Sequence, residues 1–160
     1  MKRVFILCLL LCVVFGLFAQ EGAGTSKKVS IGVGPEWNMN SRENFAMGGV
    51  FGFTVDLPNS FAVGLTAAYS NNFSGIQVIE PSALFRWYFL SENHTGLFVQ
   101  ADVGAYLVLE DGELKPMFSA GLHGGIRLPL GDKFFVEPFG RVGYPFAFGV
   151  GALIQVAISR

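Results

Sequence analysis

Hydrophobic and polar residues alternate along most of the chain from residue 28 onward. In the stretch IEPSALFRWYF (79–89), one set of alternate positions is apolar and consists of Ile79, Pro81, Ala83, Phe85, Trp87 and Phe89. The positions between them are occupied by Glu80, Ser82, Leu84, Arg86 and Tyr88. A period of two residues is typical of a β-strand with one apolar and one largely polar face. The stretch therefore predicts a strand, and the next question is which face points inward.

The same alternation recurs in eight runs that are joined by short connections. The runs cover residues 28–39, 44–56, 61–70, 76–89, 97–109, 117–128, 134–144 and 146–159. The connections lie at 40–43, 57–60, 71–75, 90–96, 110–116 and 129–133, with a tight reversal near Tyr144-Pro145. Most of them contain the turn-forming residues Asn, Asp, Gly, Pro and Ser. Consecutive strands joined in this way predict an antiparallel up-and-down arrangement.

The composition of the two faces predicts their orientation. In a soluble sandwich or a lipocalin-like barrel, the apolar face points inward and the polar face meets water. Here about half of the polar-face positions are Gly or Ala, whereas the apolar face is continuous over all eight runs. Tilted strands of about 9–11 residues can cross the hydrocarbon layer, and a closed barrel leaves no unpaired edge in lipid. The sequence therefore predicts an all-β fold, a closed eight-stranded antiparallel transmembrane β-barrel with its apolar face outward.

Aromatic residues support this orientation because they gather at the two predicted ends of the apolar face. With the N-terminus on the periplasmic side, one rim contains Trp37, Phe45, Tyr69, Phe118, Tyr144 and Phe146. The other rim contains Phe61, Trp87, Phe89 and Phe134. Two aromatic girdles that bound an apolar band are expected of an outer-membrane barrel.

The first nineteen residues have the pattern of a secretory signal peptide. They contain two basic residues, an unbroken apolar run and a small residue at the end, so cleavage is expected after Ala19. A retained membrane helix is less favoured because the run is short, and a lipoprotein signal because leucines precede Cys12. Cleavage removes both cysteines, and no disulfide is then expected. Residues 20–27 form a short N-terminal lead, and residues 28–160 form the barrel domain.

The whole pattern resembles the small eight-stranded outer-membrane β-barrels of the OmpA/OmpX-like superfamily. The resemblance covers about Lys28 to Arg160 and rests on the signal peptide, the alternating strands, the glycine-rich inner face and the aromatic rims. It implies a monomer in the outer membrane of a bacterium with two membranes. Its implied partners are outer-membrane lipid and the barrel-assembly machinery.

Two features depart from that family. The chain ends in VAISR, whereas such barrels usually end on an aromatic residue that the assembly machinery reads. In addition, Pro35, Pro81 and Pro138 lie within predicted strands, where each removes a ladder hydrogen bond. Bulges or strand ends are expected at these prolines, or else a different register.

A set of charged residues lies on the face that is predicted to point inward. The set consists of Glu36, Glu80, Arg86, Asp102, His123, Arg127, Glu137 and Arg141. Glu80 and Arg86 are about 20 Å apart at the rise of a strand, so partners are expected on neighbouring strands. With turns centred in the gaps, Arg86 lies diagonal to Asp102 and Arg127 diagonal to Glu137. Asp102 lies nearly opposite His123 in the same register.

We interpret this set as a charge network that fills a narrow lumen and satisfies its own charges. The inward glycines leave room for the large side chains in this interpretation. Alternatively, the glycines line a water-filled cavity or a narrow pore. The sequence does not separate these two arrangements.

The predicted barrel is compatible with three functions. The first is a structural, anchoring or surface-interaction barrel, the second a narrow channel for ions or small solutes, and the third a lipid-modifying enzyme. The enzyme is least favoured because its one candidate group, His123 with Asp102 and Ser119, lies toward the middle of the barrel. His94 is expected to be a solvated turn residue. Among the cell-facing connections, LEDGELKP (109–116) is the longest and most acidic, and so the best candidate for contact with an unidentified external ligand.

Other partners are not indicated by the composition. The formal net charge is −1 at pH 7, and no basic patch suggests nucleic acid. No Cys/His cluster suggests a metal, and no glycine-rich stretch precedes a helix as in a phosphate-binding loop. No cofactor is therefore expected.

Overall fold

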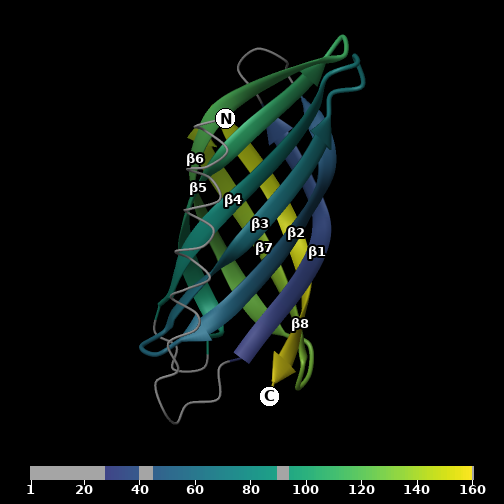
Figure 1. Cartoon of the computed structure of the whole chain (residues 1–160). Coiled ribbons are helices and arrows are strands. Elements are labelled where there is room, and N and C mark those ends of the chain that lie inside the picture. The colour runs from purple at the N-terminus through teal and green to yellow at the C-terminus, as the bar shows by residue number, and fades with distance from the viewer. Residues whose placement is uncertain (1–27, 40–44, 90–93, 160) are drawn as a thin grey trace.

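A computed structural model describes residues 28–39, 45–89 and 94–159 as a closed β-barrel (Figure 1). Each strand pairs antiparallel with its neighbours in sequence, and β1 pairs with β8 to close the barrel. The strands are β1 (Lys28–Met39), β2 (Ala46–Leu57), β3 (Phe61–Asn71), β4 (Gln77–Tyr88), β5 (Gly96–Glu110), β6 (Glu113–Pro129), β7 (Phe134–Tyr144) and β8 (Phe148–Ser159). The predicted fold class is confirmed. The signal peptide, the N-terminal lead and the connection at 40–43 lie outside the described residues.

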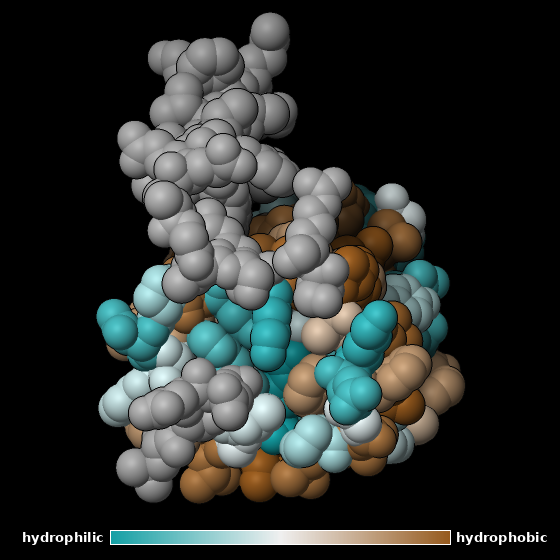
Figure 2. Space-filling view, turned by 90° about the horizontal axis from the view of Figure 1, so that it is seen from below, coloured by the Kyte–Doolittle hydropathy of each residue, from teal (hydrophilic) through white to brown (hydrophobic). Residues whose placement is uncertain are grey.

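Burial separates the two faces of each strand. In β4, Glu80 and Arg86 are buried, whereas Ile79, Phe85 and Trp87 are about half exposed. Further exposed apolar side chains surround the barrel, among them Val33, Phe51, Val103, Leu122, Val142 and Ile154. Seen from below, hydrophilic residues gather toward the middle and hydrophobic residues around them (Figure 2). The charged face therefore points into the barrel and the apolar face outward, as the alternation predicts. Within the described ranges, no helix has the length and apolar character needed to span a membrane.

The prolines within strands leave the register unchanged. Pro35 pairs with Gly49 and Pro81 with Ala67, so pairing is continuous on one side of each. On the other side of Pro81, the β4–β5 pairing stops at Ile79↔Leu107 and resumes at Ser82↔Gly104 in the same register. Pro138 likewise lies in an unbroken β7–β8 ladder and beside a gap in the β6–β7 ladder. Beside Pro35, the β1–β8 pairing stops at Val33↔Ile154 and resumes at Glu36↔Gly151. Each proline thus interrupts one ladder, and the expectation of a bulge, a strand end or a different register at these prolines is wrong.

The predicted connection at 110–116 is wrong. β5 continues to Glu110 and β6 begins at Glu113, so that Asp111 and Gly112 alone form the turn. Both turn residues have positive φ angles, 51° and 81°. An Asp-Gly pair adopts this conformation readily and allows the strands of a hairpin to pair up to the turn. The segment is therefore the end of a long β5–β6 hairpin, which extends beyond the other strands at the top of Figure 1.

Gly48 lies where two strands approach closely. A Cβ atom at this position would fall on the carbonyl oxygen of Tyr69 in β3 and lie 2.7 Å from the Cα of Ser70. We expect Gly48→Ala to lower the free energy of unfolding by about 1–3 kcal/mol, because the backbone must shift. Gly124→Ala is the control, since a Cβ there meets nothing within 4 Å. Denaturant titration of detergent-folded protein measures both, and equal stability of the two variants would contradict the close approach.

Candidate functional site

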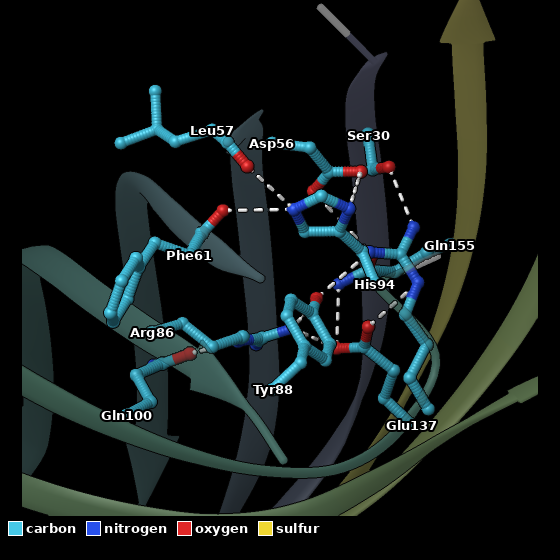
Figure 3. Close-up of polar contacts among 11 residues, drawn as sticks. Ser30, Asp56, Leu57, Phe61, Arg86, Tyr88, His94, Gln100, Glu137 and Gln155 are labelled. Atoms are coloured by element: carbon cyan, nitrogen blue, oxygen red, sulfur yellow. Dashed lines mark hydrogen bonds and ion pairs between the residues drawn. The ribbon is translucent and has the colours of Figure 1, made fainter. Parts of the chain in front are cut away.

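The lumen contains a group of charged and polar residues centred on Glu137, which we name the Glu137 cluster. Glu137 in β7 is fully buried, with a relative exposure of 0%. Its Oε2 lies 2.8 Å from Nη1 of Arg86 in β4, and its Oε1 lies 3.3 Å from Nε of Arg127 in β6. Gln155 in β8 also donates a hydrogen bond of 2.8 Å to Oε2. One carboxylate thus lies beside two guanidinium groups (Figure 3).

Further polar groups form hydrogen bonds with the two arginines. The hydroxyl of Tyr88 accepts hydrogen bonds of 3.0 Å from Arg86 and 2.9 Å from Arg127. Arg127 also donates to Oγ of Ser30 at 2.7 Å and lies 3.9 Å from Oδ1 of Asp56. Nε of Arg86 donates to Oε1 of Gln100 at 2.8 Å. With Asp56 included, the Glu137 cluster contains two positive and two negative groups.

Aromatic rings cover the flat faces of the same arginines. The guanidinium carbon of Arg86 lies 4.0 Å from the centre of the Phe98 ring. That of Arg127 lies 4.2 Å from the centre of the Phe135 ring. Such cation–π contacts are favourable where the cation is removed from water. The inward aromatic residues therefore hold the arginines as well as filling space.

A second charge group surrounds Arg141, and we name it the Arg141 cluster. Nε of Arg141 in β7 lies 2.6 Å from Oε1 of Glu36 in β1, and Nη2 lies 3.0 Å from Oε2 of Glu80 in β4. Arg141 also donates to Oδ1 of Asn38 at 3.2 Å. The ring of Phe146 lies 3.9 Å from its guanidinium carbon.

Asp102 and His123 form a separate pair on neighbouring strands. Oδ2 of Asp102 in β5 lies 2.7 Å from Nε2 of His123 in β6, and the imidazole stacks on Phe139 at 5.5 Å. Gln100 links this pair to the Glu137 cluster by donating to Oδ1 of Asp102 at 2.8 Å. Ser119 lies four residues from His123 on the same strand, about 13 Å away at the rise of a strand. The three residues therefore do not form a nucleophile, base and acid array.

The structure buries the eight predicted network residues in the lumen, and one of the three predicted pairings differs. Arg127 lies beside Glu137 and Asp102 beside His123, as the register indicates. Arg86, however, pairs with Glu137 rather than with Asp102. The expectation that partners come from neighbouring strands is wrong for this pair, because β4 and β7 face each other across the lumen. An arginine side chain is long enough to cross so narrow a barrel.

Sequence reasoning missed His94, which is not a solvated side chain. Its Nε2 lies 2.8 Å from the carbonyl oxygen of Leu57 and 3.1 Å from that of Phe61. Its Nδ1 lies 3.9 Å from Oδ2 of Asp56. These carbonyl groups flank the β2–β3 turn, and their contacts with Nε2 hold the imidazole against that turn. The alternation within strands carries no signal for a residue that lies between β4 and β5.

Apolar side chains fill much of the remaining lumen. One buried group consists of Val50, Ala62, Ala68, Tyr88, Phe98, Phe139 and Leu153. A second, with Val78 and Tyr106, includes Phe146. The cavities between these groups are small, and one is lined by residues such as Thr66, Leu84, His123 and Leu153. The described part of the lumen is thus packed with alternating ionic and apolar side chains.

Nine of the ten aromatic residues predicted for the rims have exposed or partly exposed side chains. Phe45, Tyr69, Phe118 and Tyr144 are exposed near one end, as are Trp87 and Phe134 near the other. Trp37, Phe61 and Phe89 are partly exposed, and Trp87 lies 4.3 Å from Phe89 between ring centres.

The assignment of Phe146 to a rim is wrong. Phe146 is only 1% exposed and lies inside the barrel against Arg141. The turn at 145–147 separates β7 from β8, so the alternation of the strands does not extend through it. The inward position requires small neighbours, and a Cβ on Gly143 would lie 2.8 Å from the Phe146 ring.

The side chains of the lumen offer no evident metal site. Within 28–39, 45–89 and 94–159, no three His, Cys, Asp or Glu side chains come together in a way that could hold a metal ion. The carboxylates of the two clusters are instead directed at arginines. The chemistry of the lumen is therefore that of charge pairing.

A closed eight-stranded barrel with an apolar outer belt, aromatic rims and a charge-paired interior defines a transmembrane β-barrel of the outer-membrane type. Neisserial surface protein A (NspA) has a similar structure, with a TM-score of 0.62 and 13% identity over 85% of this chain and 99% of that chain. The N-terminal β-barrel domain of Pseudomonas aeruginosa OprF matches with a TM-score of 0.59 and 12% identity over 85% of this chain and 100% of that chain. A de novo designed transmembrane β-barrel matches with a TM-score of 0.50 and 12% identity over 86% of this chain and 100% of that chain.

These likenesses concern the fold, because the identities are low. No protein-family model and no curated protein matches the sequence. At the level of fold, the structures of NspA and OprF confirm the resemblance to small outer-membrane barrels. Such a fold, with lipid-compatible side chains around it, is that of an outer-membrane protein.

Proposed function

We propose that this protein is an integral outer-membrane barrel with a structural, anchoring or surface-interaction role, and that its own side chains close the lumen. The observation that carries the proposal is the pairing of charges across the barrel, from β4 to β7 and from β7 to β1. A residue that lines a conducting path keeps its charge available to ions and water. Here the arginines are buried against carboxylates and aromatic rings.

The proposed barrel is a monomer that outer-membrane lipid surrounds and that the barrel-assembly machinery inserts. It has no catalytic role in this proposal, because the Asp102–His123 pair lies inside the barrel and away from lipid headgroups. In this proposal, an external ligand contacts the exposed end of the barrel opposite the strand termini Lys28 and Ser159.

Planar-bilayer recording tests whether the lumen is closed. We expect the wild-type protein to insert without steady conductance steps. The double variant Phe139→Ala/Leu153→Ala is expected to conduct, because both side chains belong to the buried apolar group of the lumen. Phe134→Ala is the matched control, since its ring is exposed outside the barrel and its loss leaves the lumen unchanged.

A heat-dependent shift in electrophoretic mobility verifies that each variant is folded before recording. Steady, ion-selective steps from the wild-type protein would contradict the closed lumen and favour the narrow channel. If the correctly folded double variant does not conduct, these two side chains are not what closes the lumen.

A further inference from the structure

The apolar outer face is longer on β5 and β6 than on the other strands. On β6 the outward positions run from Leu128 to Leu114, and both of these side chains are exposed. On β3 the outward positions run only from Phe61 to Tyr69. At a rise of about 3.3 Å and a tilt of about 40°, these spans correspond to roughly 35 Å and 20 Å along the barrel axis. The apolar band of an outer-membrane barrel is about 25 Å tall, so β6 extends well beyond it.

The end of the β5–β6 hairpin has two chemically different faces. We name residues 107–118 the hairpin extension. Its outer face contains Leu107, Leu109, Leu114, Pro116 and Phe118, and its inner face contains Val108, Glu110, Glu113, Lys115 and Met117. The outer residues Leu109 and Leu114 are directly paired, and only the Glu110↔Glu113 pair lies between them and the Asp111-Gly112 turn.

The charges of the extension are all on its inner face or at its tip. Nζ of Lys115 lies 2.7 Å from Oε2 of Glu110, and the two side chains are 53% and 40% exposed. On the outer face, Leu114 and Phe118 are each 60% exposed. A hairpin that stands free in water has no reason to sort its residues in this way. The same separation of apolar outer residues from polar inner residues is present in the membrane-spanning part of these two strands.

We infer that the outer face of the hairpin extension is a lipid-contact surface, which lies against the acyl chains of the outer leaflet. Lipid is the occupant because the face is continuous with the apolar belt of β5 and β6 below it, without an intervening polar residue on its outer positions. Only the Asp111-Gly112 tip and the inner face then meet water. Since the other strands are shorter, the barrel tilts toward this side or the hairpin leans into the leaflet.

Tryptophan fluorescence in vesicles tests this surface. The full chain carries Trp37 and Trp87, which are replaced by Phe so that one new tryptophan reports alone. Leu114→Trp probes the outer face, and Lys115→Trp, one residue away on the inner face, is the matched control. Both are reconstituted into unilamellar vesicles of dioleoyl phosphatidylcholine, with and without bromine atoms on the acyl chains. A heat-dependent band shift verifies folding, and Leu109→Trp replaces Leu114→Trp should that variant not fold.

We expect brominated chains to quench the tryptophan at position 114 and aqueous iodide to leave it bright. The tryptophan at position 115 should behave in the opposite way. Quenching of position 114 by iodide and not by bromine would overturn the inference, because the outer face would then meet water. Protection of position 114 from both quenchers would also overturn it, since a second copy of the chain or another part of this one would then cover the face.

Discussion

Replacing Glu137 with alanine is expected to lower the free energy of unfolding by about 3–5 kcal/mol, a large fraction of the stability of a domain of this size. The carboxylate is completely buried and lies beside Arg86 and Arg127. Its removal leaves two buried guanidinium groups with too little negative charge near them. Urea titration of the detergent-folded protein, followed by the heat-dependent band shift, measures the loss.

Glu110→Ala is the matched control for this prediction. Glu110 also forms an ion pair at 2.7 Å, with Lys115, but both side chains are exposed, and surface pairs contribute little. A double variant adds a second check. Glu137→Leu combined with Arg86→Met should be less damaging than Glu137→Ala, because it leaves fewer unpaired charges. Equal effects of Glu137→Ala and Glu110→Ala would show that the cluster is not a net source of stability.

Replacing Leu122 with arginine is expected to reduce stability by about 2–4 kcal/mol or to prevent membrane insertion. Leu122 lies on the outer face near the middle of β6, is 56% exposed and pairs with Val142 in β7. An arginine there must place its charge within the hydrocarbon layer. The yield of heat-modifiable protein in lipid vesicles, followed by urea titration, measures the effect.

Leu130→Arg separates this effect from a general cost of replacing leucine. Leu130 is 65% exposed but lies in the turn between β6 and β7, outside the apolar belt. We expect it to fold and insert as the wild-type protein does. Equal tolerance of both substitutions, in a protein that is soluble without detergent, would mean that the outer face meets water. The chain would then be a soluble barrel.

The strands and their faces were predictable because one simple physical rule governs them. Successive side chains point to opposite faces, so the residues of 79–89 separate into two sets whatever their neighbours do. The rule holds through Pro81, since the proline only removes a hydrogen bond and does not add a residue to the strand. It ends where a strand ends, and this is why Phe146 was assigned to the wrong side.

The partners of the lumen charges were less predictable, because they depend on distances through space. The hydrogen-bonded ladder between β6 and β7 fixes which residues lie opposite each other, and it therefore predicts that Arg127 lies near Glu137. It carries no information on which strands face each other across the closed barrel, and the pairing of Arg86 with Glu137 depends on that. The sequence also underestimates the length of the hairpin extension, because the turn-forming residues Asp111, Gly112 and Pro116 indicate a longer connection. Two residues with positive φ are enough to reverse the chain there.

The ion pair between Arg86 and Glu137 has a consequence for the order of folding. The two residues are 51 positions apart and lie on strands that do not pair with each other. They can meet only after the hairpins between them have formed and the sheet has curved around, so the contact belongs to the last stage of assembly. Contacts that form after the transition state slow unfolding and leave the folding rate almost unchanged. We therefore expect the Arg86–Glu137 pair to influence how long the barrel stays closed, whereas the alternating strands determine whether it closes.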